Sequence, residues 1–567
     1  MRIKNTVKNS FIFLFPFILL AYILFCINIL IKDFSYGHKS HNLIFRYPVS
    51  WAFYEIDLLK KKLINNFFYN DNAGLDPYYV YIPDKSFSSL EKDIPNSTKN
   101  YVPGFYVDSN EYKRINLRYI GDNPDNWMFN KKSLRIKLRK DESNFLERYF
   151  EFKFPREQNE LLQIIPYLLS DKLKILSPKH ELVELYINNS SEGIFIKRER
   201  LNENFLRRNK IMPVNLYKGE QTNNSENKIG LEDNLFSNSG LWEKIAIQNK
   251  FNESNKDDLN YFLSKIIEAE NSQKSIDEIL ENGNLENFAL NEILLILLQS
   301  EAQDNGHNFR LAIDNWSGKI YNIPQDIYYS PINIKKENYI VDIVINDLFR
   351  VLNQSSKYLN YKYEKLYDEI LNKEVINKII FDLEKNKEKY LTSKKRDFGH
   401  IIFKNLKKED LLKRELNLLD DNENYVDKTI SSLKDRNNNL INLLKSNPNV
   451  SWQNNKNSFS IKIDGLLPVE NLYIDFKNEQ PKWIVLDLNN NNLVDDEDIY
   501  FYPDKDGKFF LDVKLFANRV PVRILEKRSY KKKLNTINTK FNFIVENNKI
   551  PINISSFNKF SKNKFTI

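Results

Sequence analysis

The chain has 567 residues, enough for several domain-sized units, and 41% of them are hydrophobic, so buried cores rather than disorder are expected. Its net charge of +8 is the balance of 84 basic and 76 acidic residues, which argues against a nucleic-acid partner because such proteins carry a dominant basic surface. The single cysteine, Cys26, excludes an intramolecular disulfide and a cysteine-ligated zinc site.

The first predicted element is an apolar segment at residues 11–31, which follows a short N-terminal segment at 1–10 and contains no charged residue. A helix of this length spans the ~30 Å hydrocarbon core of a bilayer. Lys32 and Asp33 follow directly, where a cleaved signal peptide would carry small residues. We therefore predict an uncleaved transmembrane helix and a single-pass membrane protein. A slight excess of positive charge before the segment predicts that the body lies outside the cytoplasm.

Residues 32–76 are predicted to form a juxtamembrane stalk, because 51–68 carry apolar residues at roughly helical spacing. From residue 77 the pattern changes to short strand-like runs with alternating apolar positions. Strands are predicted at 79–82, 115–119, 133–138 and 181–187. This part of the chain is therefore expected to be rich in β-structure.

A mainly helical region is predicted next, interrupted by a β-hairpin. Residues 287–300 place apolar side chains at the spacing of a buried helix. A hairpin is predicted from strands at 309–313 and 319–323. Residues 340–446 again have a helical pattern. A β-rich half followed by a helical half is typical of a two-lobed α+β enzyme, so we predict one such domain over 77–447.

After Pro448 the pattern returns to alternating strands, which predicts a small β domain with a tail over 448–567. An acidic segment of this region has the spacing of a calcium-binding loop. Its oxygen-bearing side chains occupy positions 1, 3, 5, 9 and 12 of that spacing: Asp487, Asn489, Asn491, Asp495 and Asp498. Asn492 stands where glycine usually makes the turn. The alternatives are a weak Ca²⁺ site and a plain acidic hairpin turn.

Several short motifs occur in order between residues 78 and 445. They are Leu117–Asp122 followed by Trp127, Lys131–Leu138, Glu184–Asn188 with Glu192–Phe195 and Glu199, Asn215–Lys218, Asn291–Asn308 and Ile323–Asp326. Each is weak alone, but together and in this order they resemble the CotH (spore-coat protein H) family of atypical protein kinases. The resemblance covers roughly two thirds of the chain and implies a two-lobed kinase-like domain.

The resemblance also implies roles for particular residues. Asp304 resembles the catalytic base, and Asp326 resembles a metal ligand, with Asn308 as a second one. The implied function is transfer of a phosphoryl group from ATP, with Mg²⁺, to Ser or Thr of protein partners by a membrane-anchored kinase. The alternative for these residues is a simple turn and a strand end.

A lysine is expected to bind the phosphates of the nucleotide. Lys132 shares strand parity with Leu134 and Ile136, so it is predicted to point to the buried face, oriented by a carboxylate such as Glu199. The alternative is an ordinary solvated lysine at a strand start. Histidines at metalloprotease spacing, a nucleophile elbow and a Walker loop are absent from the sequence.

Two departures from the family pattern bear on activity. Gln325 stands where the family has tryptophan, and Tyr328 stands where an acidic residue often follows. One potential metal carboxylate is therefore missing. The rival prediction is a weakened or inactive kinase-like scaffold that binds partners at the cell surface or envelope.

Overall fold

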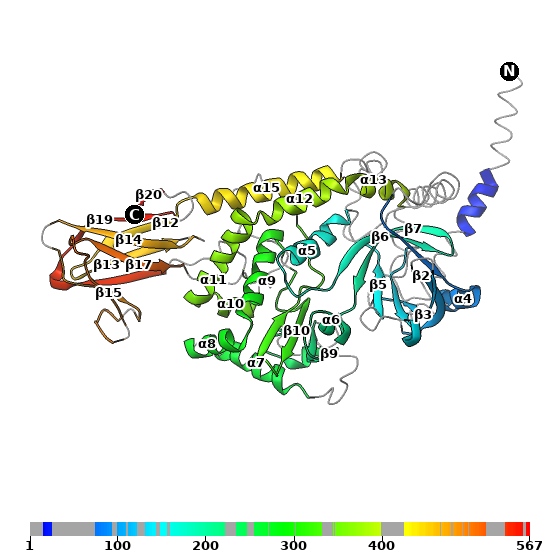
Figure 1. Ribbon diagram of the computed structural model, residues 1–567, viewed down its shortest axis with the longest axis horizontal. Helices are drawn as coiled ribbons and strands as arrows, with labels where there is room; N and C mark the ends of the chain where they lie inside the picture. Colours follow the sequence, from blue (N-terminus) through cyan, green and yellow to red (C-terminus); the bar gives the residue numbers. More distant parts are fainter. Residues whose placement is uncertain are drawn as a thin grey trace, which may run out of the picture. The chain divides into compact units, whose positions relative to one another are not determined.

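The computed structural model describes part of the chain in atomic detail (Figure 1). The described residues are 15–24, 74–92, 99–108, 111–121, 131–142, 148–155, 159–220, 234–245, 255–269, 272–300, 302–330, 344, 346–397, 425–464, 467–477, 480–489, 491–496, 498–517, 539–558 and 563–567. They fall into two compact units: unit 1 comprises Met1–Glu160, His180–Arg200 and Asn386–Val426, and unit 2 comprises Leu161–Lys179, Leu201–Lys385 and Asp427–Ile567.

The transmembrane prediction is wrong for the part of the chain that is described. Of the predicted span at 11–31, the structure describes residues 15–24, which are helical. No helix among the described residues is long and apolar enough to cross a membrane. The predicted membrane partner and single-pass localisation are corrected accordingly. The stalk helix predicted at 51–68 lies outside the described residues.

Unit 1 is built on a closed barrel of seven strands in the order β1-β2-β3-β4-β5-β7-β6. The strands are β1 (Pro77–Tyr81), β2 (Val102–Asp108), β3 (Glu111–Tyr119), β4 (Leu134–Leu138), β5 (Tyr149–Lys153), β6 (His180–Ile187) and β7 (Ser190–Glu199). The helices α4 (Asp84–Lys92) and α13 (Lys387–Arg396) belong to the same unit. The predicted strands at 79–82, 115–119, 133–138 and 181–187 are confirmed.

The barrel closes because its first strand pairs with a strand about 100 residues later in the chain. β1 runs parallel to β6, with Pro77 opposite Glu184. Along β4 the side chains of Leu134, Ile136 and Leu138 are buried, and they pack in a core with aromatic residues such as Phe152. Alternation therefore fills the barrel interior with apolar side chains and leaves polar ones outside.

The predicted two-lobed kinase-like fold with an N-terminal transmembrane helix is thus wrong. The β-rich part is a closed barrel rather than an open sheet, and α13 belongs to the same compact unit although it lies nearly 190 residues after β7. Hydrophobic alternation identifies strands, but it does not reveal which strands pair across long stretches of chain. The chain contains both helices and strands, but they form a seven-stranded barrel and a second unit rather than the predicted two lobes.

Unit 2 contains a four-stranded sheet in the order β11-β10-β8-β9, with helices around it (Figure 1). Its strands are β8 (Asn215–Gly219), β9 (Trp242–Lys244), β10 (Phe309–Asp314) and β11 (Lys319–Asn322). Its helices are α5 (Leu161–Lys172), α6 (Glu203–Arg208), α7 (Asp257–Glu268), α8 (Gln273–Asn282), α9 (Leu285–Leu298), α10 (Asp347–Leu352), α11 (Ser356–Tyr367), α12 (Val375–Lys385) and most of α15 (Tyr425–Lys445). The predicted hairpin is confirmed as β10 and β11.

The helix α9 confirms the predicted buried helix. Its N-terminus is capped by Asn284, whose side chain accepts a hydrogen bond from the N–H of Asn287. Every residue from Asn287 to Leu298 is buried. The helix ends where Gln299 adopts a left-handed conformation, with φ of 51°. This ending directs the chain into the loop that carries Asp304.

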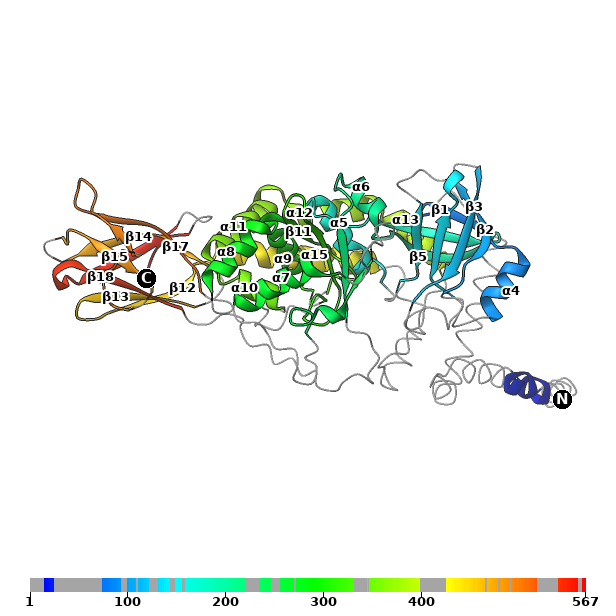
Figure 2. The same cartoon turned by 90° about the horizontal axis from the view of Figure 1, so that it is seen from below.

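The C-terminal part of unit 2 consists of two antiparallel sheets that share one apolar core (Figure 2). The five-stranded sheet contains β12 (Asn449–Asn454), β13 (Ser458–Asp464), β15 (Ile484–Asp487), β16 (Ile499–Phe501) and β18 (Thr539–Val545). The four-stranded sheet contains β14 (Val469–Phe476), β17 (Phe509–Leu515), β19 (Pro551–Phe557) and β20 (Lys564–Thr566). Strands were predicted here, and the domain boundary at 448 stays a prediction.

Candidate functional site

The candidate site lies at one end of the four-stranded sheet of unit 2. In the antiparallel register Phe309 of β10 is opposite Gly219 of β8, and Leu311 is opposite Asn322 of β11. The start of β10 and the ends of β8 and β11 therefore lie at the same end of the sheet. Asn308 directly precedes β10, and Asp326 follows β11 by four residues. The topology thus directs both predicted metal ligands to one end of the sheet.

The loop that carries Asp304 is held by its own hydrogen bonds. One carboxylate oxygen of Asp304, Oδ1, accepts the N–H of Gly306 at 2.8 Å and contacts Nδ1 of His307 at 2.9 Å. Asn305 ties the loop to α10, because its side-chain oxygen accepts the N–H of Asp347 at 2.8 Å. The loop is therefore a fixed support that presents a carboxylate with 23% of its side chain exposed.

Asn308 adopts a left-handed conformation, with φ of 64°, which asparagine tolerates better than most residues. Its amide nitrogen donates to the carbonyl oxygen of Ala302 at 2.8 Å. That bond fixes the orientation of the amide and leaves its carbonyl oxygen as the atom suited to a hard cation. Asn308 thus has the chemistry expected of a magnesium ligand.

Gln303 was not identified from the sequence, yet it joins the parts of the site. Its side chain is almost fully buried. The amide nitrogen donates to the backbone oxygen of Asn308 at 3.4 Å, and the amide oxygen accepts from the side chain of Asn322 at 3.3 Å. Gln303 therefore links the loop to the last residue of β11. A glutamine before an aspartate has no distinctive sequence pattern, so no signal pointed to it.

Asp326 lies beyond the end of β11 and also has a left-handed backbone, with φ of 48°. Its N–H donates to the hydroxyl of Tyr167 in α5 at 3.1 Å. A non-glycine residue in this region is uncommon and persists where the surroundings fix it. Tyr167 provides part of that restraint. Gln325 beside it is buried, and Tyr328 is 44% exposed.

Charged groups surround His307 at this end of the sheet. The hydrogen bond to Asp304 raises the pKa of His307, and the carboxylate of Glu220 adds to the effect. Glu220 itself contacts Arg310 at 3.1 Å and Lys218 at 3.5 Å. These last residues are cross-strand neighbours on β10 and β8. The site therefore combines carboxylates with buried positive charge.

The predicted phosphate-binding lysine lies in unit 1. The side chain of Lys132 is 15% exposed and contacts the carboxylate of Glu91 in α4 at 3.3 Å. Glu199 lies on β7 opposite Phe150. Lys132 lies two residues before Leu134, which is opposite Phe152, and Phe152 is opposite Lys197 rather than Glu199. The register therefore separates Lys132 from Glu199 along the barrel. The roles of Lys132 and Glu199 in nucleotide binding stay predictions.

The neighbouring lysine, which was overlooked, makes a fully buried ion pair. Nζ of Lys131 lies 2.6 Å from Oδ1 of Asp397, and the two side chains are 2% and 4% exposed. Asp397 opens an Asp-Phe-Gly triplet of the kind that holds metal in protein kinases. In this structure its carboxylate pairs with Lys131. The pair links two segments of unit 1 that lie 266 residues apart.

The predicted calcium loop has an ordered hydrogen-bond pattern. The carboxylate of Asp487 accepts the N–H groups of Asn491 and Asn492 at 3.2 and 2.8 Å. The side chains of Asn489 and Asn491 donate to Asp495 at 2.7 and 3.1 Å. Asn492 has the left-handed conformation that the turn position requires, with φ of 61°.

The last aspartate of that loop, Asp498, faces the backbone. Its two oxygens accept the N–H groups of Leu488 and Asp495 at 3.0 and 3.1 Å. Among the described residues, no group of three or more His, Cys, Asp or Glu side chains is arranged to hold a metal ion. Calcium binding by the loop therefore stays a prediction.

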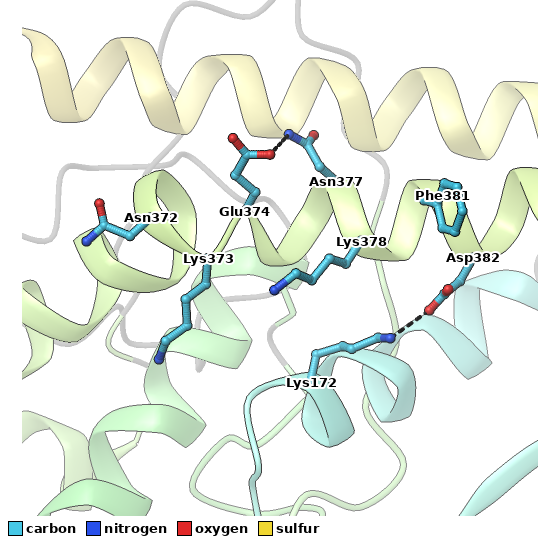
Figure 3. Close-up of a pocket in the computed structure, with 8 residues that line it drawn as sticks. All are labelled: Lys172, Asn372, Lys373, Glu374, Asn377, Lys378, Phe381 and Asp382. Atoms are coloured by element: carbon cyan, nitrogen blue, oxygen red, sulfur yellow. Dashed lines mark hydrogen bonds and ion pairs between the residues drawn. The ribbon is translucent and has the colours of Figure 1, made fainter.

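A cavity of about 520 Å³ lies apart from these residues, beside α12 (Figure 3). Three lysines line it, and one of them, Lys172, pairs with Asp382 at 2.8 Å. Phe381 is its one large apolar side chain and is 64% exposed. Ligand sites are mostly apolar and concave. We therefore base the candidate site on the residues at the end of the sheet rather than on this cavity.

A comparison with protein families decides the family of the chain. The family model described as CotH kinase protein matches residues 117–402, just over half of the 567 residues. The chain belongs to the CotH kinase protein family. The comparison with curated proteins found no match. The CotH match includes Lys132, Glu199, Asp304, Asn308 and Asp326, so the family assignment made from the motifs is confirmed.

Proposed function

We propose that this CotH-family protein transfers the γ-phosphoryl group of ATP, with Mg²⁺, to Ser or Thr residues of protein partners. The observation that carries the proposal is the common location of Asp304, Asn308 and Asp326 at one end of the sheet of unit 2. Phosphoryl transfer needs little covalent chemistry from the protein. It needs metal ligands, positive charge around the phosphates and a group that orients the acceptor hydroxyl.

The chemistry of these residues fits a magnesium site of the kinase type. Mg²⁺ in such sites takes one or two protein oxygens and completes its shell with phosphate oxygens and water. A carboxylate from Asp326 and the amide oxygen of Asn308 would hold it. A cluster of three carboxylates is therefore not required. When bound, the ion would neutralise charge on the phosphates.

The carboxylate of Asp304 would orient and accept the proton of the acceptor hydroxyl. Both of its contacts within the loop use Oδ1. The second oxygen, Oδ2, is then the atom suited to a substrate hydroxyl. Its neighbour His307 bears a raised pKa, caused first by the bond to Asp304. The contact with His307 would also hold the Asp304 carboxylate in one orientation, as a general base requires.

A decisive test uses the binding of ATP to the purified full-length protein with and without Mg²⁺. In Asp326→Ala the Mg²⁺-dependent part of the affinity should disappear while the fold is retained. The matched control is Asp382→Ala, which removes one carboxylate from α12, outside the candidate site. Unchanged affinity for Mg²⁺-ATP in Asp326→Ala would refute the assignment of this ligand.

A non-catalytic scaffold is the second candidate, and one observation favours it. Tyr328 occupies the position of the missing acidic residue and is 44% exposed. A site with one carboxylate fewer binds the metal more weakly. If the protein is a scaffold that has lost this carboxylate, Tyr328→Asp should create or strengthen Mg²⁺-dependent ATP binding. Strong binding by the natural chain, with no gain in this variant, would argue against the scaffold.

For the loop from Asp487 to Asp498 we propose weak Ca²⁺ binding. The support is the fixed orientation of Asp487 and the left-handed turn at Asn492. Binding would require Asp495 and Asp498 to exchange their present hydrogen bonds for contacts with the ion. This exchange opposes binding and is a second reason, besides the short Asp498 side chain, to expect low affinity.

A further inference from the structure

A group of arginines gathers on the outer face of the barrel in unit 1. Strand register places Arg118 of β3 opposite Arg135 of β4, Arg135 opposite Glu151 of β5, and Glu151 opposite Arg198 of β7. Cross-strand neighbours on one face lie ~5 Å apart. The strands β3, β4, β5 and β7, which are neighbours in the barrel, thus contribute a continuous row of charged side chains. Arg200 directly follows the end of β7 and lies over the ring of Tyr149, which is on the same face of β5 as Glu151.

We call Arg118, Arg135, Arg198 and Arg200 the arginine cluster. Glu151, with 3% of its side chain exposed, is shared by two of its members: Arg135 contacts Oε1 at 2.6 Å, and Arg198 contacts Oε2 at 2.6 Å. Both of these arginines are only 18% exposed. One carboxylate therefore serves two largely buried guanidinium groups.

The other members of the arginine cluster lack a carboxylate partner within the described residues. Arg118 lies over the ring of Tyr101 at 5.2 Å, and its buried Nε has no hydrogen-bond partner there. Arg200 lies over the ring of Tyr149 at 5.7 Å. The aromatic rings attract cations, but they do not neutralise them. Among the residues that the structure describes, four guanidinium groups thus gather around the carboxylate of Glu151 in a region of low to intermediate exposure.

Such an excess of positive charge is unfavourable without an anion. Burial, and next the positive charge of Arg135, lower the pKa of Arg200. Further cations border the cluster: Lys137 and Arg148 lie over the ring of Tyr149 at 5.7 and 5.3 Å. Guanidinium groups are planar and donate paired hydrogen bonds, which match the oxygens of a phosphoryl group. The arrangement therefore suits a compact, doubly charged anion.

We propose that the arginine cluster is a binding site for a dianionic phosphoryl group. The phosphoryl group can come from a phosphorylated protein segment or from a nucleotide, which share this chemistry. The site is distinct in composition from the candidate site of unit 2, because it contains arginines and tyrosines rather than metal ligands. It requires no catalysis, so it stands independently of the proposed transfer reaction.

The test uses full-length protein and three probes in calorimetric titrations. The probes are a short peptide with one phosphoserine, its unphosphorylated twin, and ATP without Mg²⁺. The variants are Arg118→Gln and Arg200→Gln, because neither residue binds Glu151 and the buried pairs with Arg135 and Arg198 remain. The control is Arg114→Gln, on the same strand as Arg118, which removes one charge from a half-exposed pair with Asp141.

We expect the wild type to bind the phosphoserine peptide or ATP, and not the unphosphorylated twin. Each cluster variant should weaken that binding roughly tenfold or more, since hydrogen bonds to charged groups are among the stronger ones. Arg114→Gln should change it little. Loss confined to the peptide identifies a phosphorylated segment, and loss confined to ATP identifies a nucleotide. Asp326→Ala should leave peptide binding intact, which separates this site from the proposed active site.

Three results would overturn the proposal. The first is no binding of either phosphorylated probe to the wild type at millimolar concentration. The second is an equal loss of affinity in Arg114→Gln, which would indicate only a general effect of charge. The third is unchanged affinity in both cluster variants. Thermal unfolding of each variant, compared with the wild type, verifies that the barrel remains folded.

Discussion

The buried ion pair in unit 1 gives a quantitative prediction about stability. Lys131 and Asp397 expose 2% and 4% of their side chains, and their charged atoms lie 2.6 Å apart. Replacing Lys131 with methionine would keep much of its volume but leave Asp397 charged and buried, with Lys394 as a more distant cation, 3.9 Å from Oδ2. Removing one partner of a buried pair costs ~3–5 kcal/mol. We therefore expect Lys131→Met to destabilise the barrel by an amount in this range.

Two companion variants separate charge from packing. In Lys131→Met/Asp397→Leu the buried carboxylate that lost Lys131 is removed as well, while Lys394 keeps its ion pair with Glu160, so the double variant should be more stable than Lys131→Met. Gly193→Ala approaches the same carboxylate from the barrel side. Its added Cβ would lie 2.1 Å from Oδ1 of Asp397, and Gly193 has a φ of +83° that disfavours alanine. This variant should also be strongly destabilised.

Hydrogen exchange measured by mass spectrometry is the appropriate assay, because it reports on peptides of the barrel separately from unit 2. A loss of 3–5 kcal/mol corresponds to roughly two to four orders of magnitude in the exchange rates of its slowest amides. Arg114→Gln, which removes an exposed pair, should change them by about tenfold at most. A loss of under ~1 kcal/mol in Lys131→Met would refute the reasoning that this pair is desolvated and essential.

Three further predictions concern other parts of the chain. Burial raises the pKa of Glu151, but Arg198 and Arg135 overcome this effect and hold the pKa well below its ordinary value of 4.5. The resulting stability is full above pH 4.5 and declines as the pH falls towards the depressed pKa. Glu151→Gln should therefore flatten the acid side of a plot of stability against pH, and an unchanged plot would contradict this. Gln303→Met removes two hydrogen bonds and should lower the free energy of unfolding by ~1–3 kcal/mol in urea titrations, whereas an unchanged midpoint would mean that the link is unimportant. Calcium at ~10⁻⁴ to 10⁻³ M should raise the unfolding temperature of the wild type but not of Asp487→Ala, and no response at several millimolar would leave an acidic turn.

Local elements were predictable from the sequence wherever periodicity was strong. Leu134, Ile136 and Leu138 alternate with charged residues, and the structure places them on the inner face of a strand. The apolar residues from Phe288 to Leu298 form a helix as predicted, and the strands at 309–313 and 319–323 form the hairpin. In each case the spacing of apolar residues within the element itself identifies its type, so the local pattern contains the information.

Long-range pairing was not predictable in the same way. β1 pairs with β6, and Lys131 pairs with Asp397 over 266 residues, although neither member of a pair has a pattern that refers to the other. The two-lobed prediction failed for this reason. The role of Gln303 was also hidden, because its partners are two amides brought together only by the hairpin register. The sequence motifs were sufficient to identify the family, whereas the long-range contacts became known only from the structure.

The central claim is that the end of the sheet in unit 2 transfers phosphoryl groups. The most direct measurement is incorporation of label from γ-labelled ATP, with Mg²⁺, into the purified protein and into a serine-rich peptide. We predict incorporation on serine or threonine by the wild type, and its loss in Asp304→Asn, which keeps the size of the side chain but cannot accept a proton. Binding of Mg²⁺-ATP should persist in that variant. Equal incorporation by Asp304→Asn, or none by a wild type that binds Mg²⁺-ATP, would contradict the account.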